Sequence, residues 1–219
     1  MIYQEKMDTT EVLLLGTFVL ALGGTLVAAQ KRLDLYGVIF VTCISALGGG
    51  TARDILIGHY PLSWVQDIRY VIAVITAIFF ALAFRRFLKR ISNALFIVDS
   101  IGSAIFTISS VQHCLDLEVH PAIAVVLGMF SVTIGSVLRD VLCNDVPGIL
   151  RRELNASAAI VGGVAYLGIH QVPWFGAMQV ILPMILIVGL RIAARKYRLS
   201  LPIITEKPFK KARISFKKS

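Results

Sequence analysis

Charge is what this 219-residue chain lacks most. Only 16% of its residues are charged, whereas 57% are hydrophobic, a balance far from that of soluble proteins. Acidic residues are scarcer than basic ones, 13 against 22, which leaves a formal net charge of +9. This composition argues against a soluble helical protein and indicates a chain with several membrane-spanning segments.

Recognisable catalytic and ligand-binding motifs are missing as well. The three cysteines form an odd set without paired spacing, which argues against a disulfide framework or a zinc site. No nucleophile, base and orienting group stand in a catalytic pattern, and no phosphate-binding loop is present. We therefore expect no enzyme activity, no catalytic residue, no bound metal and no cofactor.

Apolar runs between the charges predict seven transmembrane helices. A span of about 20 apolar residues matches a hydrocarbon core about 30 Å thick. The sixth run is short, with about 14 apolar residues by the same measure. The runs are Val12–Ala29, Leu35–Ile57, Tyr70–Phe84, Ala94–Val111, Pro121–Cys143, Leu154–Leu167 and Trp174–Leu190.

The basic residues gather on one side of these spans. With seven crossings, one face receives Lys31, Arg32, Arg85, Arg86, Lys89, Arg90, Arg151, Arg152 and the basic tail from Arg191 onward. Because cytoplasmic loops carry the excess of Lys and Arg, the N-terminus is expected outside and the C-terminus in the cytoplasm. The net charge therefore does not indicate a nucleic-acid partner. The tail Lys207–Lys218 is expected to lie near anionic membrane lipids.

The chain contains an internal repeat. An offset of 86 residues aligns Arg53-Asp54 with Arg139-Asp140, Gly49 with Gly135 and Pro61 with Pro147. Each copy holds three spans, so the second copy enters the membrane from the opposite side, as in many transport proteins. The prediction is an all-α polytopic membrane protein with an inverted 3+3 repeat. Its parts are repeats over residues 12–92 and 93–170, a seventh helix over 171–195 and a cytoplasmic tail over 196–219.

Glycines and charges interrupt spans two and five. Gly48-Gly49-Gly50 weakens span two, and Gly135-Ser136 lies at the matching place in span five. We expect both helices to kink or break there. Thr51 and Asp54 have the capping-box spacing of a helix that restarts. Thr17, Ser109 and Ser110 are expected to bond to their own helix backbones.

Five ionisable residues lie in or next to these spans: Arg53, Asp54, Asp99, Arg139 and Asp140. Such groups usually face the interior of a bundle or an aqueous cavity. The Arg-Asp pairs either anchor helix ends and bridge the repeats, or line or gate a polar path. Asp99 lies at the cytoplasmic interface or joins that lining, paired with Arg53 or Arg139.

The repeated three-helix unit with GGGTARD over residues 48–54, followed by Pro61 and Trp64, resembles the trimeric intracellular cation channels. In particular, it resembles their bacterial branch of paired glycine-rich membrane domains. The resemblance implies a homotrimer in a bacterial or archaeal inner membrane. It implies a pore in each protomer where kinked helices two and five meet, and conduction of monovalent cations, chiefly potassium.

By position, the first kink would comprise Gly48, Gly49, Gly50, Thr51, Arg53 and Asp54, and the second Gly135, Ser136, Arg139 and Asp140. With Asp99, these are the expected pore and gating residues. Inverted repeats also build secondary transporters, so a carrier of a small solute such as glycine is the alternative function. A membrane protein without transport activity is the third possibility.

Overall fold

The computed structural model describes residues 9–84, 94–150, 154–172 and 176–197, and all regular elements in these ranges are helices. Within these ranges, each of the seven predicted spans contains a helix. Five are long and apolar enough to cross a membrane: α1 (Thr9–Gln30), α2 (Leu35–Ile57), α6 (Ala94–Asp116), α7 (Pro121–Leu142) and α9 (Met178–Lys196). The basic segments over 85–90 and 151–152, the boundary at 92/93 and the tail from residue 198 lie outside the described residues.

The third and sixth predicted spans are shorter helices. Helix α4 (Arg69–Ala83) has 15 residues and α8 (Asn155–His170) has 16. At 1.5 Å per residue they reach about 22–24 Å, less than the hydrocarbon core. Each follows a very short helix, α3 (Ser63–Gln66) before α4 and η1 (Gly148–Leu150) before α8.

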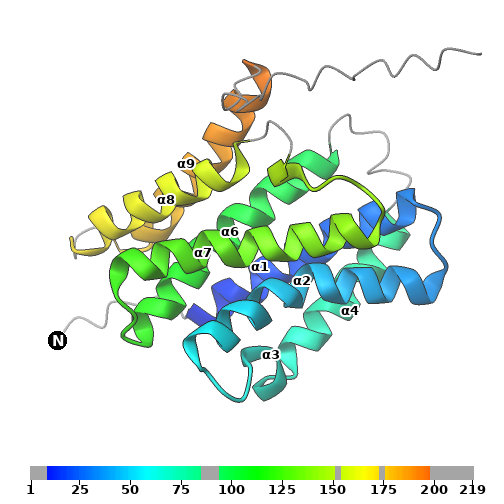
Figure 1. Ribbon diagram of the computed structural model, residues 1–219, viewed down its shortest axis with the longest axis horizontal. Coiled ribbons are helices and arrows are strands. Elements are labelled where there is room, and N and C mark those ends of the chain that lie inside the picture. Colours follow the sequence, from blue (N-terminus) through cyan, green and yellow to red (C-terminus); the bar gives the residue numbers. More distant parts are fainter. Residues whose placement is uncertain (1–8, 85–93, 151–153, 173–175, 198–219) are drawn as a thin grey trace, which may run out of the picture.

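Helices α1 and α6 form the centre of the bundle, where they pack against each other and contribute the largest numbers of buried residues. Helices α2 and α7 pack against them and against each other. In Figure 1, α8 and α9 lie at one edge and α3 and α4 at the opposite edge. The outer faces are apolar, with exposed side chains such as Leu56, Phe79 and Ile185. Such surfaces suit contact with lipid.

The 86-residue offset extends to the helix ends. Asp34 caps the start of α2 by accepting a hydrogen bond from the Gly37 amide, and His120 occupies the same position at α7. Helix α2 ends at Gly58 in the left-handed conformation, φ 69°, and α7 is followed by Asn144 at φ 55°. Glycine and asparagine are the residues that adopt this conformation most readily. The two halves therefore share their turns as well as their helices.

The glycines of spans two and five do not break the helices. Helix α2 is continuous through Gly48-Gly49-Gly50, and α7 is continuous through Gly135-Ser136. Thr51 does not cap a new helix, because its hydroxyl donates to the carbonyl of Leu47 within α2 (2.8 Å). A break in either helix and the capping box at Thr51 are therefore wrong, whereas a kink without a break stays a prediction.

The glycines instead let α2 and α7 approach closely. A Cβ atom added at Gly49 would lie 2.0 Å from the carbonyl oxygen of Ser131, and one at Gly135 would lie 2.8 Å from that of Ser45. Each helix thus presents a small-xxx-small pair, Ser45 with Gly49 and Ser131 with Gly135, as membrane helices do at close crossings. Gly49 meets Ser131 while Ser45 meets Gly135, so the two helices are antiparallel. Adding 86 to the residue numbers of α2 gives the contacting residues of α7, so the two contacts are equivalent in the repeat.

The central helices cross in the same way. A Cβ at Gly16 of α1 would touch Ile105 and Phe106 of α6, and a Cβ at Gly102 of α6 would touch Val19 and Leu20 of α1. These two contacts are also equivalent under the 86-residue offset, and their order along the chain shows that α1 and α6 are antiparallel. The core of the bundle is therefore two antiparallel crossings between equivalent helices.

Candidate site: two buried arginine–aspartate clusters

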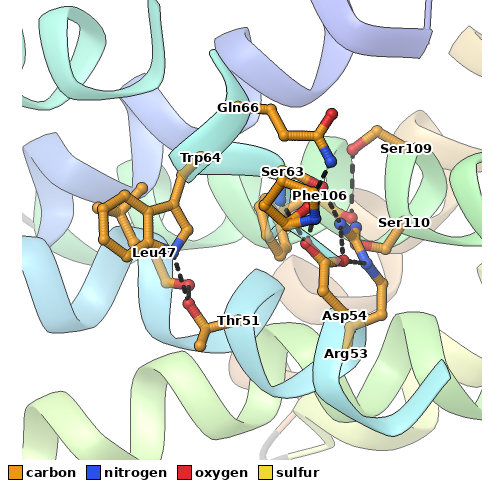
Figure 2. A network of polar contacts seen from close by, with 11 residues as sticks. Leu47, Thr51, Arg53, Asp54, Ser63, Trp64, Gln66, Phe106, Ser109 and Ser110 are labelled. Carbon is orange, nitrogen blue, oxygen red and sulfur yellow. Dashed lines mark hydrogen bonds and ion pairs between the residues drawn. The ribbon is translucent and has the colours of Figure 1, made fainter. Parts of the chain in front are cut away.

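Two clusters of buried charges are called outer and inner after the orientation predicted from the sequence. The outer cluster contains Arg53, Asp54, Ser63 and Ser110, and it lies where α2, α3 and α6 meet (Figure 2). The side chains of Arg53 and Asp54 are 1% and 0% exposed. Arg53 donates to Asp54 Oδ1 from Nε (2.9 Å) and from Nη2 (2.7 Å). Its Nη1 donates to the hydroxyl of Ser110 (3.0 Å). The pair is thus desolvated and neutral overall, and it ties α2 to α6.

Helix α3 covers this cluster through Ser63. The amide and the hydroxyl of Ser63 both donate to Asp54 Oδ2, at 2.9 and 2.7 Å. Next to it, the indole of Trp64 donates to Thr51 Oγ1 (3.0 Å). Figure 2 shows these side chains converging on α2. The segment after α2 is therefore held against the helix by the same carboxylate that neutralises Arg53.

The inner cluster contains Asp99, Arg139, Asp140 and Arg191, from α6, α7 and α9. Arg139 donates to Asp99 (2.9 Å) and to Asp140 (2.9 Å). Arg191 donates to the other oxygen of Asp99 (2.6 Å) and to its backbone carbonyl (3.2 Å). Of the two partners that the sequence left open for Asp99, the structure selects Arg139 and not Arg53.

The 86-residue offset relates Arg53 and Asp54 of the outer cluster to Arg139 and Asp140 of the inner cluster, but the inner cluster has one more carboxylate. Leu13 is the counterpart of Asp99, and it lines a small cavity beside Arg53. The outer arginine therefore has one carboxylate partner, whereas the inner arginine has two. The cavity measures about 20 Å³, room for about one water molecule. Thr17, Gly50, Asp54, Tyr70 and Phe106 also line it.

The remaining predicted site residues lie between or beside these clusters. Gly48 faces Leu138 of α7, and Gly49 and Gly135 form the close crossing. The hydroxyl of Ser136 donates to the carbonyl of Thr133 in its own helix. The close crossing explains why glycine stands at positions 49 and 135.

Three cluster residues were not in the predicted set. The sequence analysis assigned Arg191 to the basic cytoplasmic face, but its side chain is buried, 4% exposed, and paired with Asp99. Ser110 binds Arg53 instead of its own helix, whereas Ser109 and Thr17 do bond to their helix backbones. Nothing in the sequence indicated that Ser63 binds Asp54, apart from its position shortly after that residue. For Arg191 the available signal was six apolar residues before it, Ile185–Leu190.

Charges at helix ends and in the connections form separate surface pairs. Lys31 binds Asp145 (2.7 Å) between the connections that follow α1 and α7. At the start of α4, Arg69 binds Glu11 and Asp67 (2.6 and 2.7 Å). The hydrogen bonds that Arg69 donates lower the pKa of the Asp67 carboxyl. Among the described residues, no three His, Cys, Asp or Glu side chains converge as a metal site.

The fold and the buried clusters define a polytopic helical membrane protein with paired charges inside its bundle. The family described as "Glycine transporter" matches residues 12–86 and 96–171, one segment for each repeat. The chain belongs to this family.

Curated relatives cover nearly the whole chain. The UPF0126 inner membrane protein YadS of Escherichia coli is 33% identical over 193 residues, 86% of this chain and 92% of that protein. A UPF0126 membrane protein of Vibrio cholerae is 30% identical over 203 residues, 91% of this chain and 85% of that protein.

Solved structures confirm the resemblance to trimeric intracellular cation (TRIC) channels. The TRIC orthologue from Rhodobacter sphaeroides superposes with a TM-score of 0.77 and 27% identity, covering 87% of this chain and 98% of that chain. A prokaryotic TRIC channel in 0.5 M KCl gives a TM-score of 0.77 and 26% identity, covering 89% and 99%.

Proposed function

We propose that the chain forms a homotrimeric channel for monovalent cations, chiefly potassium, with a pore inside each protomer. The observation that carries this proposal is the Arg53–Asp54 pair, which is at most 1% exposed inside a bundle of membrane helices. Buried ionisable groups in membrane proteins typically mark ion or solute pathways. The similarity to solved TRIC cation channels supports the same function.

Unpartnered hydroxyls support a polar path between the clusters. Ser100 and Thr107 of α6 and Ser131 of α7 are 0% exposed, and their hydroxyl oxygens have no hydrogen-bond partner among the described residues. Buried polar groups normally find a partner in protein or in ordered water. Water or a partly dehydrated cation would supply that partner in a conducting state.

In the proposed mechanism, ion pairs close both ends of this path. Arg53 is neutralised by Asp54 at the outer end, and Arg139 by Asp99 and Asp140 at the inner end. The α2–α7 crossing at Gly49 and Gly135 lies between them. Gating then consists of a change at this crossing, with Gly48–Gly50 and Gly135–Ser136 as its flexible points, that releases the arginines from the path.

The architecture proposed with this function is an inverted 3+3 repeat, residues 12–92 and 93–170, followed by a seventh helix and a cytoplasmic tail. Its support is the exchange of contacts at the two antiparallel crossings. The N-terminus would lie outside and the C-terminus in the cytoplasm of a bacterial or archaeal cell. The charge asymmetry of the connections supports this orientation.

A carrier for a small solute such as glycine is the second candidate, because the matching family is described as "Glycine transporter". Reconstitution of the purified protein into liposomes and planar bilayers separates the two functions. Discrete unitary currents in potassium chloride are expected from a channel. Saturable, ion-coupled glycine uptake without unitary currents would instead establish the carrier.

Removing the outer arginine is expected to change conduction. Arg53→Ala leaves Asp54 as an unpaired carboxylate beside the path, so single-channel conductance or open probability should change by about tenfold. Arg139→Ala is expected to change the single-channel conductance or open probability in the same way, through the inner end of the path. The measurement is single-channel recording, with Lys31→Ala as the matched control because Lys31 forms an exposed pair. Wild-type currents in both arginine variants would show that the clusters do not line the conduction path.

A further inference from the structure

Phe106 of α6 lies between the two clusters. Asp99, Phe106 and Ser110 share one face of the helix, because positions seven and four residues apart stack on successive turns. Asp99 holds the inner arginines, and Ser110 accepts a hydrogen bond from Arg53. The single large apolar side chain on this face is therefore placed between two polar groups that belong to opposite ends of the proposed path.

The ring of Phe106 bounds the outer cavity. Phe106 is 3% exposed, and it lines the same cavity as Arg53, Asp54 and Thr17. Figure 2 draws it near Arg53 and Asp54. The ring tip lies 3.5 Å from the position that a Cβ at Gly50 would take, and the ring edge lies 3.3 Å from that of Gly16. Two glycines thus border the ring, one on α2 and one on α1.

We propose that Phe106 is a hydrophobic gate that separates the outer cavity from the inner cluster. An apolar constriction blocks ions by excluding water from a narrow segment. The ring stands where the polar face of α6 is interrupted, and the cavity that it lines together with Gly50 provides space beside it. This inference rests on the proposed channel function and adds a second barrier to the ion pairs.

The polarity of residue 106 tests this gate. Phe106→Ser is expected to raise open probability at least about tenfold, because a hydroxyl keeps the constriction wet. Phe106→Leu keeps an apolar side chain and should leave the channel as closed as the wild type. Gly50→Ala adds a methyl group at ordinary contact distance from the ring, so it should fold and lower open probability.

Ile108→Ser is the matched control. Ile108 is on the same helix and 0% exposed. Both residues pack in apolar clusters, but only Phe106 also lines the cavity. The variants should be recorded in planar bilayers, after size-exclusion chromatography has shown that each is folded. If Phe106→Ser fails to fold, Gly50→Ala carries the test.

The outcomes separate the gate from the channel function. Increased opening in Phe106→Ser but not in Ile108→Ser supports the gate, as does reduced opening in Gly50→Ala. If the wild type conducts and neither Phe106→Ser nor Gly50→Ala differs from it, the gate is wrong and the channel function stands. If neither the wild type nor any variant conducts, the channel function fails and the gate with it.

Discussion

Gly49→Ala is expected to destabilise the protein by about 3 kcal/mol or more. The added methyl carbon would lie 2.0 Å from the backbone carbonyl of Ser131, and a backbone atom cannot move aside as a flexible side chain can. Helices α2 and α7 would have to separate along their whole crossing. The expected result is a loss of monodisperse protein in detergent and a lower thermal midpoint in a fluorescence-based melting experiment.

Gly168→Ala and Gly189→Ala are the matched controls for this prediction. An added Cβ at either glycine meets nothing within 4 Å, although both residues lie in helices. Alanine favours a helix over glycine by about 1 kcal/mol, so these variants should be as stable as the wild type or more stable. Gly135→Ala, at 2.8 Å from Ser45, should be destabilised less than Gly49→Ala. Wild-type stability of Gly49→Ala would refute the close crossing.

Asp99→Asn is expected to destabilise the protein by about 3–5 kcal/mol. The substitution removes the only carboxylate that Arg191 contacts among the described residues, and one of the two that Arg139 contacts. Two arginine side chains, 10% and 3% exposed, would then face a neutral amide and repel each other. The measurement is the thermal midpoint of the purified protein, together with the fraction that remains monodisperse.

A second substitution identifies the cause of this loss. In the double variant Asp99→Asn, Arg191→Gln one of the two opposed charges is gone, so part of the stability should return. Asp145→Asn is the control, because it removes a carboxylate paired with Lys31 where both side chains are more than a third exposed. Such surface pairs contribute at most about 1 kcal/mol. Equal losses in Asp99→Asn and Asp145→Asn would contradict the buried network.

Helix positions were predictable from the sequence because hydrophobic length is a local property. The predicted range Leu35–Ile57 is the observed α2, and Pro121–Cys143 differs from α7 by one residue. The 86-residue repeat was predictable from the alignment of Arg-Asp, glycine and proline residues. It proved to hold for caps and turns too, such as Gly58 and Asn144.

The close packing of α2 and α7 at the glycines was not predicted from the sequence. Low helix propensity indicated a break at Gly48–Gly50, but propensity is a weak term when a neighbouring helix occupies the space that glycine leaves. Ser45 and Gly49, with Ser131 and Gly135, have the small-xxx-small spacing that predicts a close crossing instead. The same spacing rule could have been applied to these residues in the sequence.

The sequence limited the possible ion-pair partners of the buried charges but did not identify each pair. Arg53-Asp54 and Arg139-Asp140 were adjacent and therefore evident, and Asp99 had two possible arginines. The choice depends on which helices cross at which depth, and that is a tertiary property. Arg191 was missed because the positive-inside rule assigns a basic residue near the end of a span to the interface, whereas α9 turns it toward Asp99.

The reversal potential of the wild-type protein in a planar bilayer, under a potassium chloride gradient, tests cation conduction most directly. A cation channel is expected to give unitary currents that reverse near the potassium equilibrium potential. Currents that reverse near the chloride equilibrium potential would contradict cation selectivity. A silent bilayer from folded protein, with saturable uptake of glycine by liposomes of the same preparation, would contradict a channel altogether.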